Sequence, residues 1–155
     1  MSKTYSAQLT CPRCAANYSA TLFQTLWIEV STNRALVFED RVNIATCPLC
    51  AFEARVNAPL MCTNVPRQFA VWFEPQRTTL VDEMTAQFAQ AMGSGSFYAT
   101  APRIADWEEF KAIIEKFENG ELKGRAASFN LDALRRITAA SAPKTSFLDR
   151  LFGKK

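Results

Sequence analysis

The chain has 155 residues, a formal net charge of +3, and 48% hydrophobic against 21% charged residues. This balance excludes wholesale disorder, collagen and coiled-coil rods. No apolar run approaches the roughly 18 residues of a membrane span, and the first residues lack the apolar core of a secretory signal, so we expect a cytoplasmic protein. The absence of histidine excludes every catalytic device that needs an imidazole and leaves sulfur and oxygen as side-chain metal ligands.

Strand-like patterns dominate the first half of the chain. Tyr5, Ala7 and Leu9 alternate with polar residues and predict a strand that leads into Cys11. Further strand-like segments are residues 18–22, 26–30, 35–38, 42–46, 52–56 and 69–73, with a turn at 31–34. We therefore predict an α+β protein whose residues 1–77 form a small antiparallel, zinc-ribbon-like β domain.

Four of the five cysteines form two matching Cys-Pro-X-Cys motifs, Cys11 with Cys14 and Cys47 with Cys50. The two-residue gap lets both sulfurs of a pair face one point, and proline favours the turn beneath them because its φ is fixed. Two such turns from neighbouring hairpins give a tetrahedral set of four sulfurs, which suits Zn²⁺. The motifs predict one structural zinc ion held by these four cysteines.

Other interpretations of the cysteines are weaker. A reducing compartment argues against disulfides, and a redox Cys-X-X-Cys pair should begin a helix, whereas both pairs here are flanked by strand-like alternation. Iron, as in rubredoxin-type sites, competes with zinc. Such sites usually have glycine after each pair, where φ is positive, and the alanines here, Ala15 and Ala51, predict strain with either metal. Cys62 has apolar neighbours and is interpreted as a buried, inert thiol rather than a further ligand.

The composition becomes helical over residues 78–140. Thr79 and Asp82 fit a capping box, and Asp106 begins a second helix that stops at Asn119 and Gly120. The apolar positions of the three predicted helices are Leu80, Met84, Phe88 and Met92; Trp107, Phe110, Ile113, Ile114 and Phe117; and Leu131, Leu134 and Ile137. Such stripes are far more often core than ligand sites.

Residues 141–155 are predicted to be a linker and a short amphipathic helix. Its apolar stripe consists of Phe147, Leu148, Leu151 and Phe152. Because so short a helix is unstable alone in water, the stripe must pack on its own domain, on a protein partner or, weakly, on a membrane surface. We treat these four residues as candidate partner-binding residues. The tail is also basic: residues 121–155 carry eight Lys/Arg and three Asp/Glu (+5), whereas residues 1–120 carry ten and twelve (−2).

The paired Cys-Pro-X-Cys motifs, the 52–56 strand with Ala58-Pro59-Leu60, and Arg103-Ile104 ahead of residues 109–116 resemble the CpXC domain family of bacteria and archaea. The resemblance covers roughly residues 1–120 and implies a zinc-ribbon-like fold with Cys11, Cys14, Cys47 and Cys50 as the metal ligands. Two departures stand out: alanine replaces the family's glycine after each motif, and residues 61–64 differ from the family's polar segment.

A non-catalytic, zinc-binding interaction module is the function that these features favour, as an adaptor or accessory subunit of a protein complex. A nucleic-acid-binding zinc protein is an alternative, with the basic tail contacting phosphates and Trp27, Trp72 or Phe73 as a stacking surface. Electron transfer through a rubredoxin-like iron is a second alternative. An enzyme is not expected, since the chain lacks histidine, a phosphate-binding loop and a nucleophile elbow.

Overall fold

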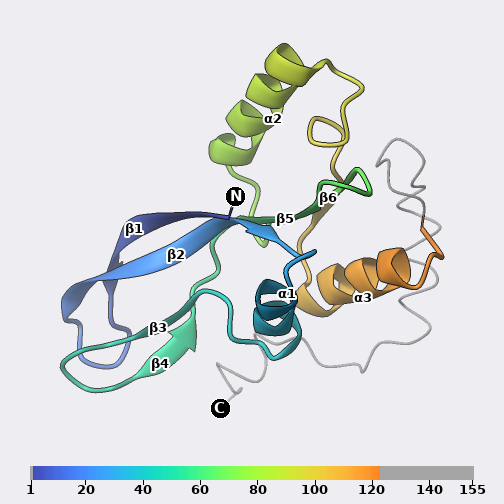
Figure 1. The fold of residues 1–155 in the computed structure, drawn as a ribbon. Helices are drawn as coiled ribbons and strands as arrows, with labels where there is room; N and C mark the ends of the chain where they lie inside the picture. Colours follow the sequence, from blue (N-terminus) through green and yellow to red (C-terminus); the bar gives the residue numbers. More distant parts are fainter. Residues whose placement is uncertain (1, 123–155) are drawn as a thin grey trace.

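The computed structural model describes residues 2–122, which form the α+β fold that the sequence predicts (Figure 1). The elements in chain order are β1 (Lys3–Thr10), β2 (Asn17–Trp27), α1 (Ser31–Phe38), β3 (Ile44–Thr46), β4 (Glu53–Arg55), β5 (Leu60–Asn64), β6 (Phe69–Phe73), α2 (Thr79–Met92), β7 (Arg103–Ile104) and α3 (Trp107–Glu118). The third predicted helix, with Leu131, and the tail residues 147–152 lie outside the described residues.

Five strands form one sheet in the order β1-β2-β5-β6-β7, and β3 pairs with β4 in a separate two-stranded sheet. The expectation of a purely antiparallel unit was wrong, because β2 pairs with β5 and β6 pairs with β7 in parallel. The physical reason is the connection between each pair. Parallel neighbours need a long crossover. The chain between β2 and β5 contains α1 and the β3–β4 hairpin, and the chain between β6 and β7 contains α2.

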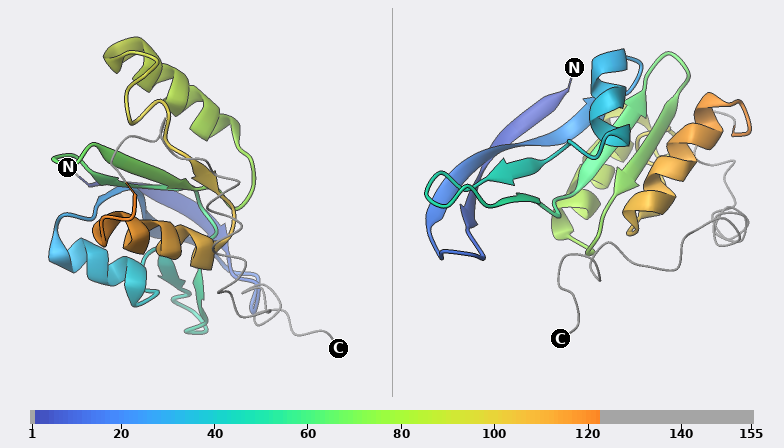
Figure 2. Two further views of the ribbon diagram at one scale, coloured as in Figure 1. Left: turned by 90° about the vertical axis from the view of Figure 1, so that its right-hand side faces the viewer. Right: turned by 90° about the horizontal axis from the view of Figure 1, so that it is seen from below.

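The large sheet has a thick core on one side and a thinner one on the other. Figure 2 shows α1, α3 and the β3–β4 hairpin below the sheet and α2 above it. Every residue of the inner strand β6 is buried, because its side chains alternate between the two sides. Phe69, Val71 and Phe73 join the α1/α3 core, and Ala70 and Trp72 join the α2 core.

Helix α3 is the most amphipathic element and seals the thicker core. Asp106 caps it as predicted, with its carboxylate accepting a hydrogen bond from the backbone N–H of Glu109 at 2.8 Å. Its buried face consists of Trp107, Phe110, Ile113, Ile114 and Phe117. The same core contains residues from Leu26 to Phe73, so α3 and the strands share one apolar interior. The proposed division after residue 77 stays a prediction.

Helix α1 replaces the predicted turn at 31–34 and strand at 35–38, and both of those expectations were wrong. A four-residue apolar run has no periodicity that distinguishes a strand from a buried helix face. Here Val37 is fully buried, and Leu36 and Phe38 pack against the main core. An ion pair between Arg34 and Glu118, 2.7 Å between Nε and Oε1, joins α1 to the end of α3.

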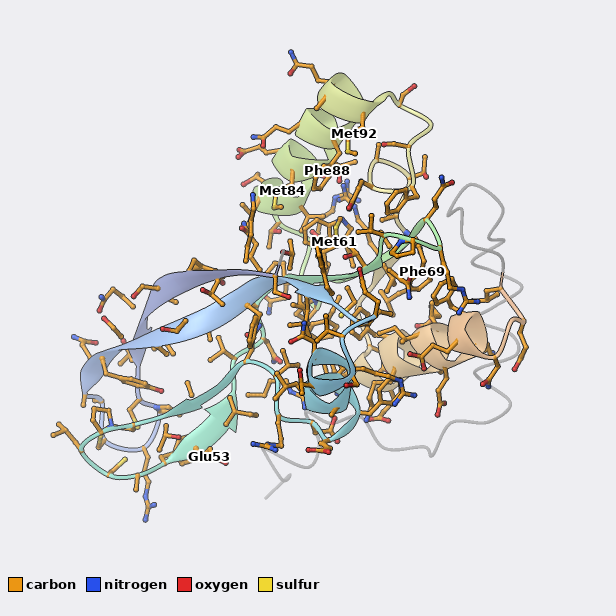
Figure 3. The ribbon with its side chains drawn as sticks, viewed as in Figure 1. Glu53, Met61, Phe69, Met84, Phe88 and Met92 are labelled. Carbon is orange, nitrogen blue, oxygen red and sulfur yellow. The ribbon has the colours of Figure 1, made fainter. Side chains whose placement is uncertain are left out.

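Helix α2 lies on the thinner side of the sheet. Its N-cap is Thr78, one residue before the predicted Thr79, and the Thr78 hydroxyl accepts a hydrogen bond from the Val81 N–H. Figure 3 shows Met84 and Phe88 on the side of α2 that faces Met61. The outer residues of the predicted stripe are not core: Leu80 is 38% exposed and Met92 is 55% exposed. Within residues 2–122, none of the helices combines the length and apolar character needed to cross a bilayer.

Candidate metal centre

The two Cys-Pro-X-Cys motifs occupy the tips of two hairpins. Residues 11–16 connect β1 to β2, and residues 47–52 connect β3 to β4. The tips of these hairpins lie side by side in Figures 1 and 2. The sulfur atoms of Cys11, Cys14, Cys47 and Cys50 all lie within 4.8 Å of one another. All five cysteines of the chain are within the described residues, and all are free thiols.

The two turns have the same backbone geometry. In the first, the Cys11 N–H donates to the Ala16 carbonyl at 2.8 Å, and the Ala15 N–H donates to the Cys11 carbonyl at 2.9 Å. The second repeats both bonds at the same lengths, from Cys47 to Phe52 and from Ala51 to Cys47. Each turn therefore directs its two sulfurs toward one point, as the repeated motif predicts.

Both alanines after the motifs adopt the left-handed conformation, with φ of 59° at Ala15 and 56° at Ala51. A Cβ atom in this region is too close to the following carbonyl, which costs roughly 1–2 kcal/mol for each residue. The turn geometry is thus kept although glycine is absent, and the strain that the sequence predicts falls on these two residues.

Hydrogen bonds to sulfur change the acidity of the first motif. Burial raises the pKa of the Cys11 thiol, but the N–H groups of Cys14 and Arg13 and the thiol of Cys50 outweigh burial and lower the pKa to about 7. At Cys14 the N–H of Ala16 lowers the pKa, yet burial and the other three thiols together raise it to about 12. The Cys11 thiol therefore ionises easily, and its negative charge then opposes the ionisation of Cys14.

The cluster fits a tetrahedral metal ion. Zinc bound at about 2.3 Å by four thiolates separates neighbouring sulfurs by about 3.8 Å. The Cys11–Cys50 and Cys14–Cys47 sulfur pairs are 3.6 and 3.7 Å apart. Each of these close pairs joins one hairpin to the other. A divalent cation would favour the thiolate form of all four ligands, and the four cysteines could thus hold one metal ion that ties the hairpins together.

A buried asparagine that sequence reasoning missed positions the second hairpin. Asn43 is 6% exposed, has φ of 54°, and bonds the backbone of Phe23 on β2 through both atoms of its side-chain amide. Its own carbonyl accepts from the Val56 N–H at 2.8 Å, beyond the other end of the hairpin. The only sequence signal was the ease with which asparagine adopts positive φ.

A second set of contacts joins the same hairpin to α3. Arg55 on β4 has a buried side chain that lies over the Trp107 ring, 4.0 Å from its centroid. The Asp40 carboxylate accepts from Arg55 at 3.1 Å, from the Trp107 indole at 2.6 Å and from Lys111 at 3.1 Å. The base of the second hairpin is therefore anchored to the core, while its tip carries two of the thiols.

The fifth cysteine is separate from the cluster. Cys62 lies on β5, is fully buried in the main core, and has its pKa raised by burial. The candidate stacking residues also separate: Trp72 and Phe73 are buried, and Trp27 is half-buried. The expectation of a stacking surface at Trp72 or Phe73 was wrong, because both belong to the fully buried strand β6.

The comparisons with known proteins agree with the cysteine pattern. The family model described as CpXC protein matches residues 9–122, which include both motifs and every element from β2 to α3. Neither the curated proteins nor the solved structures gave a match. Since the model covers more than half of the sequence, the chain belongs to the CpXC protein family.

Proposed function

We propose that this protein is a cytoplasmic, non-catalytic interaction module, an adaptor or accessory subunit of a protein complex, with one structural zinc ion. The observation that carries the zinc assignment is the set of four sulfurs from two hairpin tips, with close pairs at 3.6 and 3.7 Å. Four thiolates complete a tetrahedral shell. The ion would replace an apolar core between the hairpins, where metal binding contributes on the order of 10 kcal/mol linked to folding.

A structural role is favoured over hydrolytic chemistry because of the ligand count. Zinc that activates water keeps one position open, usually with three protein ligands. The four cysteines here leave no such position, and histidine, the usual ligand and general base of catalytic sites, is absent from the sequence. The same four sulfurs could also hold iron, so zinc itself is part of the proposal.

The adaptor role rests on the C-terminal segment. Phe147, Leu148, Leu151 and Phe152 are predicted from the sequence to form an apolar stripe in a basic segment, and such a stripe would gain free energy only by packing against another surface. The alternative of nucleic-acid binding is weakened, because Trp72 and Phe73 are buried and cannot stack on bases. We therefore favour a protein partner.

Metal analysis of the purified full chain tests the first half of the proposal. We expect one zinc per chain by mass spectrometry of the metal content. A Cys11→Ser, Cys47→Ser double variant should lose it, since each hairpin then loses its buried ligand. Cys62→Ser is the matched control and should keep the zinc. A red protein that contains iron, or zinc that persists in the double variant, would contradict the assignment.

Truncation after Ala142 tests the second half. We expect the shortened chain to keep its zinc and to lose a protein that co-purifies with the full chain from its own cells. A variant with serine at residues 147, 148, 151 and 152 should behave as the truncation does. A complex that survives both changes would show that the tail is not the partner-binding segment.

A further inference from the structure

Strand β1 is an open edge of the large sheet. It pairs with β2 on one side, and no other strand within residues 2–122 pairs with its outer side. In Figure 1 the β1–β2 hairpin extends away from α2 and α3, with β1 along its outer border. Six of the eight β1 residues are exposed, and only Ala7 and Leu9 are half-buried. An unpaired row of backbone N–H and C=O groups is a template for another strand.

The usual protections of such an edge are missing along most of β1. Natural edge strands are short or carry charges, prolines or bulges. The opposite edge, β7, is two residues long and includes Arg103. In β1 the one charged residue, Lys3, and the one register irregularity both occur at its beginning. The segment from Thr4 to Thr10 has neither charge nor proline.

The register with β2 shows which backbone groups point outward. The Cys11 N–H donates toward β2, to the Ala16 carbonyl, and the pairing continues without a shift from Thr10 opposite Asn17 to Thr4 opposite Phe23. Because the direction alternates along an antiparallel strand, the odd-numbered residues of this stretch point their backbone groups toward β2. The even-numbered residues, Thr4 to Thr10, point theirs outward.

The two faces of β1 differ in polarity. Tyr5, Ala7 and Leu9 lie on one face, and Leu9 lines a pocket of about 200 Å³ together with Tyr18 and Phe52. The other face is polar and is held by side-chain bonds across to β2, from Gln8 to Ser19 at 2.6 Å and from Thr10 to Asn17 at 2.8 Å. An added strand must match both faces.

We propose that the outer edge of β1 is a dimerisation surface that pairs with β1 of a second copy, antiparallel about a twofold axis at Ala7. In this register Thr4 faces Thr10 of the second copy and Ser6 faces its Gln8, so all four outward residues form hydrogen-bonded pairs. Tyr5 then lies opposite Leu9 on the apolar face. Polar residues meet polar residues, apolar meet apolar, and both copies of Lys3 stay outside this stretch. This self-complementarity is why a second copy, rather than an unrelated peptide, is the expected occupant.

Sedimentation velocity over a range of concentrations tests the pairing with the full chain. We expect a reversible dimer for the wild type and for Ser6→Ala, which keeps the outward N–H. Ser6→Pro removes that N–H, and proline is tolerated on an edge strand at such a position. We expect its dimer dissociation constant to rise by about tenfold or more, with thermal unfolding that matches that of Ser6→Ala at concentrations where both variants are monomeric. A wild type that is monomeric throughout, or a Ser6→Pro dimer as tight as that of Ser6→Ala, would overturn the proposal.

Cross-linking tests the register without a proline. Residues opposite each other in a non-hydrogen-bonded antiparallel pair have Cα atoms about 4.5 Å apart, within the range of a disulfide. With oxidised glutathione, Ala7→Cys should therefore form a covalent dimer several times faster than Gln8→Cys, whose two copies do not face each other. The wild type gives the background from the native thiols. Equal rates for the two variants, or no covalent dimer of Ala7→Cys, would reject the twofold axis.

Discussion

Asn43 takes the place of a strand neighbour for Phe23. Its side-chain oxygen accepts a hydrogen bond from the Phe23 N–H at 2.7 Å, and its side-chain nitrogen donates to the Phe23 carbonyl at 3.1 Å. One amide thus satisfies both backbone groups of a β2 residue at the point where the chain enters the second hairpin. This contact joins β2 of the first hairpin to the start of the second, and so helps to set how the two cysteine turns lie relative to each other.

Replacing Asn43 should loosen the centre. Asn43→Gly keeps the positive φ but leaves the Phe23 backbone groups without their partner, and we expect a loss of about 1–3 kcal/mol in the free energy of unfolding. Asn43→Asp keeps the acceptor but puts a buried carboxylate oxygen against the Phe23 carbonyl, so at neutral pH it should lose at least as much. Denaturant unfolding of the metal-loaded protein measures this, and chelator extraction should be faster for Asn43→Gly. A glycine variant as stable as the wild type would show that the amide does not position the hairpin.

Glycine after each motif should stabilise the protein. Ala15→Gly and Ala51→Gly remove the strain of a Cβ at positive φ. The greater freedom of glycine in the unfolded chain offsets part of this gain, so we expect about 0.5–1 kcal/mol from each change, measured by thermal unfolding. Ala16→Gly is the control. The φ of Ala16 is not positive, so this change should lower the free energy of unfolding by about 0.5–1 kcal/mol. Equal effects at residues 15 and 16 would contradict the strain.

The Asp40 cluster should contribute stability that depends on pH. Burial raises the Asp40 pKa, but the hydrogen bonds from Trp107, Lys111 and Arg55 outweigh it, and the net pKa is lowered. A carboxylate with a depressed pKa in the folded state stabilises the protein above its unfolded pKa, about 3.9, and loses this contribution as the pH falls through its folded value. At pH 7 we expect Asp40→Asn to lose about 1–2 kcal/mol, since Asp40 is half exposed.

This loss relative to the wild type should stay constant down to about pH 5 and shrink below it. Denaturant unfolding of both proteins at each pH measures the difference. Glu39→Gln removes the acid of an exposed ion pair with Arg41 and should change the free energy of unfolding by less than about 0.5 kcal/mol. A difference for Asp40→Asn that does not change with pH would exclude the carboxylate as its source.

Zinc uptake should weaken as the pH falls. The Cys11 thiol has a pKa lowered to about 7, so roughly half of it is ionised at pH 7, and binding must release the remaining proton. Cys14, with a pKa raised to about 12, must release a full proton. Calorimetric titrations in buffers of different ionisation enthalpy should show that zinc binding releases more protons as the pH is lowered from about 8 to about 6. An affinity that does not change over this range would contradict thiolate ligation.

The sequence alone predicted the features that depend on short-range chemistry. Proline fixes its own φ, and the two-residue gap between the cysteines favours a tight turn. The two motifs therefore predict both hairpin tips without any information on the contact between them. Asp106 and the apolar spacing of Trp107 to Phe117 likewise determined α3, because helix capping and amphipathic periodicity act over a few residues. The CpXC family model matches residues 9–122, the stretch that contains these local patterns.

The tertiary structure decided the features that short-range chemistry leaves open. Residues 35–38 became a helix, and Leu60–Asn64 became a strand beside β2, because burial against α3 and β6 sets their conformation. The contacts of Asn43 with Phe23 and of Arg55 with Trp107 exist only because the tertiary fold places these residues next to each other. The free energy of such contacts depends on residues that are distant in sequence, and local propensity carries no information about which distant residue will be the partner.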